Sequence, residues 1–359
     1  MNSKTVISVI LPVRNESASL PALLASLAQQ DFPPQNFEII LADSRSTDNT
    51  RDIVQHFVSE SFVSVKLVDN PGIRSGPGRN AGIRAASGEF VLFIDGHCVI
   101  PSPNLLRDTV SLFQQTQADC LCRPQPLIAP SGSAFGSAVA AVRASLLGHG
   151  RDSLIYAMDY SGFVDPASSG AAYRRSVFDT IGVYDERFDA CEDVELNTRF
   201  HKEGLKAYTD PRLAVFYQPR TTLSSFTRQM IRYGRGRLRL MLKHPDCISA
   251  GQLAPAILVI WIVVATLAMF FVPELSWLRW AFVTPVVFYV AAVLLSSIHL
   301  ARKSGASLLY MAPIIYCAIH LGLGFGILAE GIQHARSLLA GNFPRKAIEV
   351  PECNRVQER

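Results

Sequence analysis

FVLFIDGHC, residues 90–98, decides the fold, because five apolar residues run directly into a carboxylate and an imidazole follows two places later. Three similar apolar runs come before it, and the four runs start 25 to 32 residues apart. The segments between these runs have features of helices, either leucines at helical spacing or polar residues that can start a helix. Strand, helix and strand at this spacing predict an α/β fold with a Rossmann-like, mostly parallel sheet covered on both faces. The earlier runs are VISVILPV (6–13), EIILAD (38–43) and VSVKLV (63–68).

The helices between these strands are also expected from the sequence. Leucines at helical spacing fill SASLPALLASLAQQ, between the first two strands. Between the second and third strands, Ser46 or Thr47 can cap a helix that runs to about Val58. Ligands of such sheets bind beyond the carboxyl ends of the strands. Asp43 and Asp95 each lie at such an end, so we expect them to converge on one rim.

The chain lacks the usual phosphate-binding sequence motifs. Neither G-x-G-x-x-G nor G-x-x-x-x-G-K-[ST] occurs, so a nucleotide would have to be held differently. The loop ADSRSTDNT contains Asp43 and Asp48, whose carboxylates can accept hydrogen bonds from a base or a ribose. Asp48 alone fits equally well as an ordinary loop or helix-start residue.

Asp95, Gly96 and His97 offer an oxygen and a nitrogen two residues apart, with a glycine that lets the chain turn between them. Such a pair suits Mn²⁺ or Mg²⁺, and the nitrogen favours Mn²⁺. A divalent ion would stabilise a diphosphate leaving group. The triplet is also compatible with a strand-end turn that binds no metal.

A third acidic element is RFDACEDVELNTRFHKEG, residues 187–204. Glu192 and Asp193 fall at the start of an expected helix that ends at Gly204. A carboxylate there can act as a general base for a hydroxyl group. Acidic residues in a first helical turn also complement the helix dipole without any catalytic role.

Three long apolar segments beyond residue 250 predict membrane spans, at 253–272, 278–300 and 306–329. The N-terminus has too short an apolar run for a signal peptide, so residues 1–227 are expected in the cytoplasm. Arg302 and Lys303 agree with the positive-inside rule, whereas three spans would place Arg336 and the tail 331–359, with Arg345 and Lys346, outside. Either the third segment is re-entrant or the rule is broken. The expected location is the inner (cytoplasmic) membrane.

The segment 228–250 opens with a strongly basic stretch. Its cations are spaced three or four residues apart and so share one helical face. This pattern predicts an interfacial helix held against anionic lipid. A net charge of only +4, with arginines beside a membrane segment, argues against nucleic-acid binding. The cations on that face are Arg228, Arg232, Arg235, Arg239 and Lys243.

In combination, five segments resemble the inverting family-2 glycosyltransferases of the GT-A fold. The resemblance covers about residues 4–245 and is greatest to membrane-anchored bacterial exopolysaccharide enzymes of the succinoglycan glucosyltransferase type. The segments are VISVILPVRNE, ADSRSTD, GPGRNAGIRAASGEFVLFIDGH, GVYDERFDACEDVELNTRFHKEG and RQMIRYGRGR.

The resemblance implies roles for individual residues. Asp43 matches the residue that holds the uracil of a nucleotide sugar, and Arg79 and Asn80 match residues that line the nucleotide site. Asp95 and His97 occupy the metal-binding Asp-x-Asp position. Asp193 matches the catalytic base, with Glu192 beside it. A further motif that covers the diphosphate and acceptor in related synthases is matched by Gln229, Arg232 and Tyr233.

Two departures from the family pattern shape the expected activity. His97 replaces the usual final aspartate, and Tyr233 replaces the tryptophan of processive synthases, which makes polymerisation a poor fit. The resemblance implies transfer of a hexose, with UDP-glucose as donor, to a polyprenyl-diphosphate-linked saccharide. The alternatives are a polyprenyl-phosphate glycosyltransferase and a non-catalytic, nucleotide-binding membrane scaffold.

Overall fold

The computed structural model describes residues 5–149, 154–166, 170–274 and 276–340. The chain divides into two compact units. The first contains the chain up to Pro126 together with Leu154–Tyr217, and the second contains Leu127–Ser153 and the long helices after Gln218. The segment after Pro126 thus groups with the C-terminal helices rather than with the sheet.

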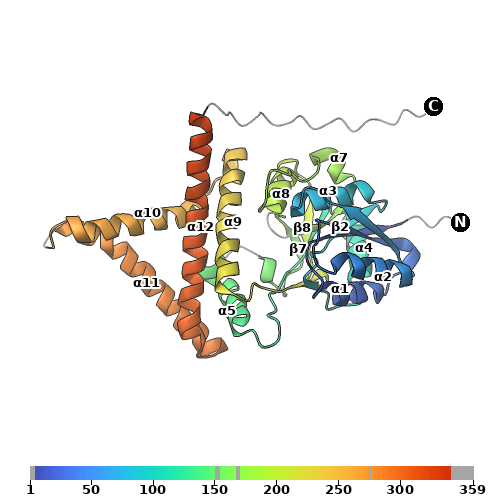
Figure 1. Ribbon diagram of the computed structural model, residues 1–359, viewed down its shortest axis with the longest axis horizontal. Helices are drawn as coiled ribbons and strands as arrows, with labels where there is room; N and C mark the ends of the chain where they lie inside the picture. The colour runs from blue at the N-terminus through green and yellow to red at the C-terminus, as the bar shows by residue number, and fades with distance from the viewer. Residues whose placement is uncertain (1–4, 150–153, 167–169, 275, 341–359) are drawn as a thin grey trace. The chain divides into compact units, whose positions relative to one another are not determined.

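An eight-stranded mixed sheet forms the centre of the first unit (Figure 1). Four strands at one side are parallel, as the sequence predicts, and the fifth is antiparallel to its neighbour β4. A separate two-stranded ribbon pairs β5 (Cys98–Val99) with β10 (Phe216–Tyr217). In spatial order the main sheet contains β3 (Ser64–Asp69), β2 (Phe37–Asp43), β1 (Ile7–Val13), β4 (Phe90–Phe93), β8 (Gly170–Arg174), β6 (Cys120–Cys122), β9 (Ala207–Thr209) and β7 (Gly162–Val164).

Helices cover both faces of this sheet, which confirms the predicted layering. Alternate residues of β1 point to opposite faces. Val9 and Leu11 belong to one buried cluster with α1 and α4, whereas Ile10 belongs to a second cluster with α3, α7 and α8. The helices of this unit are α1 (Leu20–Ala28), α2 (Thr50–Glu60), α3 (Ser75–Ala85), α4 (Leu105–Thr116), α7 (Val177–Ile181) and α8 (Glu192–Lys202).

One predicted helix start is wrong. The helix after the second strand begins at Thr50 with Asn49 as its N-cap, rather than being capped by Ser46 or Thr47. Ser46 and Thr47 instead bond Asn15 of the loop after β1. By contrast, α8 begins at Glu192, and the expected breaker Gly204 has a left-handed backbone with φ of +67°.

Long helices dominate the second unit. Three of them are long and apolar enough to cross a membrane. A shared core, with Phe226 and Met230 of α9 and Ile315 and Ile319 of α12, joins the short helix α5 to the longer ones. The helices are α5 (Ala134–Arg143), α6 (Leu146–His149), α9 (Leu223–Lys243), α10 (Ala250–Phe271), α11 (Trp277–Ser304) and α12 (Leu308–Leu339).

A close approach of α3 to β1 gives a test of this fold. A β-carbon on Gly82 would overlap the side chain of Ile10, which is fully buried. We expect Gly82→Val to lower the free energy of unfolding by about 1–3 kcal/mol through overpacking. Circular dichroism melts would measure the loss. Arg84→Val, at an exposed position of α3, is the matched control for the helix cost of valine, and equal melting of the two variants would contradict the packing.

Candidate active site

The end of β2 and the loop after β4 place Asp43 and Asp95 at one edge of the sheet. Val13 is the register partner of Asp43, and Ile10 is the partner of Phe93, so Asp95 lies nearly level with Asp43 across β1. Two strand spacings separate β2 from β4 by about 10 Å. The predicted convergence of these two aspartates on the carboxyl edge is therefore present in the backbone.

Arg79 of α3 links Asp95 to the acidic start of α8. Its guanidinium donates to Glu192 Oε1 at 2.9 Å and to Asp95 Oδ1 at 3.1 Å. The two partners come from segments almost a hundred residues apart in sequence. One cation therefore joins the strand-end carboxylate of Asp95 to Glu192, the neighbour of the candidate base Asp193.

Aromatic rings support this guanidinium from within the unit. The Arg79 guanidinium carbon lies 5.4 Å from the ring centre of Tyr184 and 6.0 Å from that of Phe93. Burial lowers the pKa of Arg79, but the charge of Asp95 and the other nearby anionic groups raises it further, so the residue stays protonated. Asn80, the next residue, is buried and holds the same segment. Its side chain bonds the backbone of Tyr184 and the carboxylate of Glu186.

Asp193 lies beside this linked pair at the start of α8. Burial and repulsion from Glu192 raise its pKa to about 6, against the lowering effects of Arg79 and of the bond from Val194 N–H. Cys191, immediately before the pair, has a left-handed backbone with φ of 62°, which is uncommon for a residue other than glycine. A carboxylate with such a pKa is ionised at neutral pH yet basic enough to accept a proton.

The pKa of Asp95 moves in the other direction. Burial raises it, but the positive charge of Arg79, followed by His97 and Arg123, lowers it below the ordinary value. Asp95 is therefore an anion at neutral pH. Cys98, three positions after Asp95, is buried, and burial raises its thiol pKa to about 12, so it carries no charge.

His97 reaches the loop after β1. Its Nδ1 lies 3.0 Å from Glu16 Oε1, and its ring packs edge-on against Tyr217 at 4.8 Å between centres. Among the described residues, no three His, Cys, Asp or Glu side chains group as a metal site. Asp95 with substrate phosphates still suits Mg²⁺ or Mn²⁺, because such ions commonly take one or two carboxylates plus phosphate oxygens and water. The donor set thus fits an ion bound together with a nucleotide.

Asp43 ends β2 at the other side of the edge, and Asp48 lies in the loop that follows. Asp43 is 1% exposed, pairs with Arg51 at 2.8 Å and accepts a bond from Ser46 N–H. Asp48 accepts bonds from Ser17 N–H and from Thr50, and these bonds lower its pKa. The structure therefore gives Asp48 the role of connecting two loops. Whether either carboxylate also meets a nucleotide stays a prediction.

The last predicted site residues belong to the second unit. Gln229 donates to the Tyr233 hydroxyl at 3.2 Å, one turn apart on α9, and Arg232 is exposed on the same helix. Gln229 itself is buried. Their assignment to the donor and acceptor sites stays a prediction.

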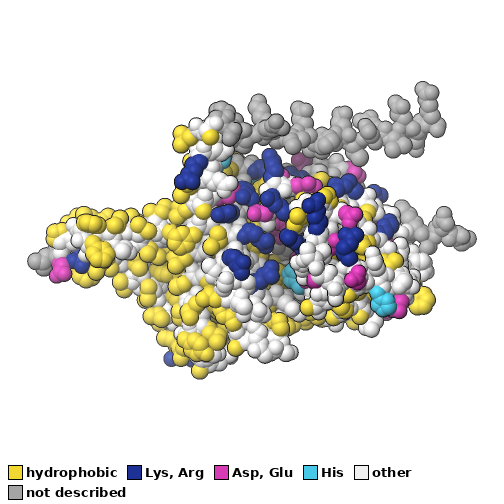
Figure 2. Space-filling view, in the orientation of Figure 1, with side chains coloured by type: hydrophobic (Ala, Val, Ile, Leu, Met, Phe, Trp, Pro, Cys, Tyr) yellow, Lys and Arg dark blue, Asp and Glu magenta, His cyan; other side chains and the backbone are white. Residues whose placement is uncertain are grey.

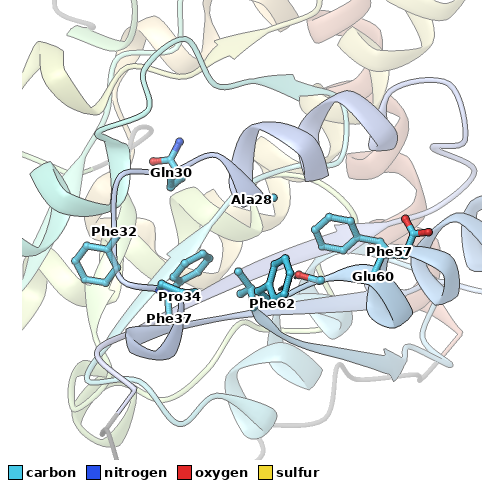
Figure 3. A pocket seen from close by; sticks show the side chains of 10 residues that line it. Ala28, Gln30, Phe32, Pro34, Phe37, Phe57, Glu60 and Phe62 are labelled. Atoms are coloured by element: carbon cyan, nitrogen blue, oxygen red, sulfur yellow. Dashed lines mark hydrogen bonds between the residues drawn. The ribbon is translucent and has the colours of Figure 1, made fainter.

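A hollow of about 480 Å³ lies at the opposite end of β2. Phe37, which begins β2, lines it with Phe32, Phe57 and Phe62 (Figure 3). Phe37 and Asp43 are six positions apart at opposite ends of β2, which corresponds to about 20 Å along the strand. This hollow is apolar and distinct from the acidic edge.

Sequence reasoning missed several partners of the predicted residues. Glu16 holds His97, Arg51 pairs with Asp43, and Tyr184 supports Arg79. The pairing of Arg51 with Asp43 could have been expected, because Arg51 lies only eight positions after Asp43, in the first turn of the following helix. Glu16 and Tyr184 had no comparable signal, because their contacts depend on how distant loops meet.

The mostly parallel sheet, with acidic residues at its carboxyl edge and at a following helix start, places the first unit in the GT-A fold class. Residues 8–182 match the family model described as Glycosyl transferase family 2, so the chain contains a domain of that family. A solved structure of similar fold is the mannosyltransferase PcManGT from Pyrobaculum calidifontis in complex with GDP-Man and Mn²⁺. It has a TM-score of 0.56 and 18% identity, over 91% of this chain and 87% of that one.

Two curated relatives match nearly the whole chain. One, from Methanococcus voltae, is a dolichyl N-acetyl-alpha-D-glucosaminyl phosphate 3-beta-D-2,3-diacetamido-2,3-dideoxy-beta-D-glucuronosyltransferase, 24% identical over 94% of this chain and 98% of its own length. The other is succinoglycan biosynthesis protein ExoA from Rhizobium meliloti (strain 1021), 27% identical over 91% of this chain and 96% of its own length. The predicted resemblance to exopolysaccharide glycosyltransferases is confirmed.

The raised pKa of Asp193 predicts an effect on stability. A carboxyl with a folded pKa of about 6 and an unfolded pKa near 3.8 costs folding free energy above pH 6, and this cost disappears as pH falls through 6 toward 4. We therefore expect Asp193→Asn to be more stable than the wild type at about pH 7.5, by on the order of 1–3 kcal/mol. The gain should shrink toward about pH 5. Thermal unfolding in detergent at several pH values measures it.

Glu195→Gln is the contrasting control on the same helix. Glu195 is fully buried and paired with Arg199 at 2.9 Å, so its neutralisation should destabilise at neutral pH. Destabilisation by both substitutions alike would show that Asp193 carries no unfavourable charge.

Proposed function

We propose that this protein is an inverting, metal-dependent hexosyltransferase. It moves a hexose, with UDP-glucose as the proposed donor, to a polyprenyl-diphosphate-linked saccharide during exopolysaccharide or surface-glycan synthesis. The observation that carries the proposal is the position of Arg79 between Asp95 and Glu192, with Asp193 beside them at a raised pKa.

Asp193 acts as the general base in this proposal. With a pKa of about 6 it is mostly ionised at neutral pH and can take the proton of an acceptor hydroxyl. The resulting oxygen attacks the anomeric carbon from the face opposite the leaving group, and a single displacement inverts that centre. Glu192 keeps the pKa of Asp193 raised, and its own bond to Arg79 fixes the start of α8.

Arg79 and Asp95 stabilise the leaving nucleoside diphosphate in this proposal. The Arg79 guanidinium is buried on an aromatic platform, with Nε lacking a hydrogen-bond partner, and can direct its charge toward phosphate oxygens. Asp95, with His97 as a second donor, would hold Mn²⁺ or Mg²⁺, which when bound supplies positive charge to the diphosphate. Asp43 would accept hydrogen bonds from the uracil. Asp48 in the loop after β2, together with Arg79 and Asn80 of α3, would complete the nucleotide site.

The acceptor is assigned from the membrane helices and the relatives. Three helices are long and apolar enough to cross a membrane, which keeps the catalytic unit at a bilayer where polyprenyl lipids reside. The Methanococcus voltae relative is named for transfer to a dolichyl-phosphate-linked sugar, and the Rhizobium relative for succinoglycan biosynthesis. We place the protein in the cytoplasmic membrane with its catalytic unit on the cytoplasmic side. Gln229, Arg232 and Tyr233 are proposed contacts for the diphosphate and acceptor.

Neutralising either aspartate tests the assigned chemistry. We expect Asp193→Asn and Asp95→Asn to reduce transfer by about 10²–10⁴-fold with melting behaviour that shows a folded protein. The wild-type kcat/KM should fall about tenfold per pH unit below about pH 6, where Asp193 becomes protonated. Glu60→Gln, at the exposed rim of the distant hollow, is the control that keeps full activity. Full activity of Asp193→Asn would favour the scaffold alternative.

Product analysis tests the substrates. Purified protein in detergent is offered a panel of UDP- and GDP-sugars with a polyprenyl-diphosphate-linked saccharide, a bare polyprenyl phosphate or a water-soluble saccharide. We expect transfer of glucose from UDP-glucose to the lipid-linked saccharide with inverted anomeric configuration. Transfer only to the bare lipid phosphate would identify a polyprenyl-phosphate glycosyltransferase instead, and transfer only to the soluble saccharide would refute a lipid-linked acceptor.

A further inference from the structure

The arginine-rich helix α9 packs directly against α12, the third apolar helix. A β-carbon on Gly322 would lie 2.8 Å from Met230 Cβ, and one on Gly326 would overlap the carbonyl oxygen of Ile231. Farther along both helices, Arg239 pairs with Glu330 at 2.7 Å. The contacts advance together along both sequences, so the two helices run side by side in the same direction (Figure 1).

This packing fixes the depth of α12 relative to the charges of α9. The cations of α9 extend from Arg228 to Lys243, and the part of α12 from Gly322 onward lies beside them. Arginines in the hydrocarbon core are costly, and those near its edge extend their side chains to the headgroups. The C-terminal part of α12 must therefore lie at the depth of the headgroups, where these cations meet phosphate and water.

The rest of α12 is too short to cross a bilayer. Leu308 to Leu321 spans about 14 residues, or about 21 Å of helix, against a hydrocarbon core of about 30 Å. Its N-terminal end follows Arg302 and Lys303 at the end of α11. Charged residues thus mark both ends of α12, as expected of a helix that stays at one surface.

An apolar stripe follows one face of α12. The stripe residues are spaced by four, eleven, seven and seven positions, which keeps them within one arc of the helix. Gly322, Gly326 and Glu330, which contact α9, lie on the opposite side. A helix with protein on one side and an exposed apolar face on the other suits the boundary between headgroups and acyl chains. The stripe consists of Tyr310, Ile314, Phe325, Ile332 and Leu339.

The two other apolar helices are suited to cross. They pair with each other through the bond from Trp261 Nε1 to the Phe282 carbonyl. Exposed apolar side chains cover both (Figure 2), among them Phe270 and Phe271 at 80%. Trp277 and Trp280 lie at the start of α11, next to the α10–α11 turn, where an aromatic belt at the far interface is expected.

We propose that the chain crosses the bilayer only twice, through a hairpin of α10 and α11, and that α12 lies with α9 in the headgroup layer of the leaflet on the catalytic unit's side. The apolar stripe faces the acyl chains, and the exposed cations of α9, Arg228 and Arg232, meet anionic headgroups. Arg302, Lys303 and Arg336 then all remain on the side of the catalytic unit, which satisfies the positive-inside rule that three spans would break.

Epitope accessibility in the full-length protein tests this topology. One tag is placed before the N-terminus, one after Glu274 in the α10–α11 turn and one after the C-terminus, each in a separate variant expressed in a bacterial inner membrane. Antibody binding is compared between intact and permeabilised spheroplasts. We expect the tag after Glu274 to bind antibody in intact spheroplasts, whereas the two terminal tags bind only after permeabilisation.

Two results would overturn the proposal. An accessible C-terminal tag with a protected N-terminal tag would show that α12 crosses the membrane. A protected tag after Glu274 would show that the α10–α11 hairpin does not cross. As a control for folding, each tagged variant should be extracted in detergent as monodisperse protein. Antibody access to the tags does not depend on the proposed enzymatic function.

Discussion

The sharing of one guanidinium between two acidic segments is the interaction on which the site depends. Arg79 neutralises Asp95 and Glu192, which would otherwise repel each other and Asp193 across a buried space. Because the cation is held between aromatic rings and two carboxylates, the sheet edge and the start of α8 keep a fixed geometry. Loss of that cation would leave Asp95, Glu192 and Asp193 without the positive charge that they share.

The two aspartates near this cation differ in pKa. Attraction from Arg79 keeps the pKa of Asp95 low, whereas burial and the charge of Glu192 keep that of Asp193 high. Divergent pKa values in neighbouring carboxyl groups are the usual basis for distinct acid, base and ligand roles. In the proposed reaction Asp95 stays an anion for the diphosphate and its ion, while Asp193 accepts a proton.

The sequence predicted the backbone frame well, because its signals were local. Four apolar runs gave the parallel strands, and the acidic start and Gly204 end of α8 were visible in the residue order. The convergence of Asp43 and Asp95 followed from strand polarity alone. The bridging of Asp95 and Glu192 by Arg79, and of His97 by Glu16, depends on tertiary contacts that no local pattern encodes. Three membrane spans conflict with the positive-inside rule. The proposal that removes this conflict rests on the contacts of Gly322 and Gly326 with α9, which the sequence does not reveal.

A structure of the full-length protein with UDP, a divalent ion and lipid nanodiscs tests the central claim most directly. The account predicts the diphosphate between Arg79 and Asp95, the uracil against Asp43, and Asp193 facing the position of the sugar's anomeric carbon. A nucleotide bound in the aromatic hollow around Phe37 and Phe62, or one that leaves Arg79 paired only with its carboxylates and touches none of the three aspartates, would contradict it.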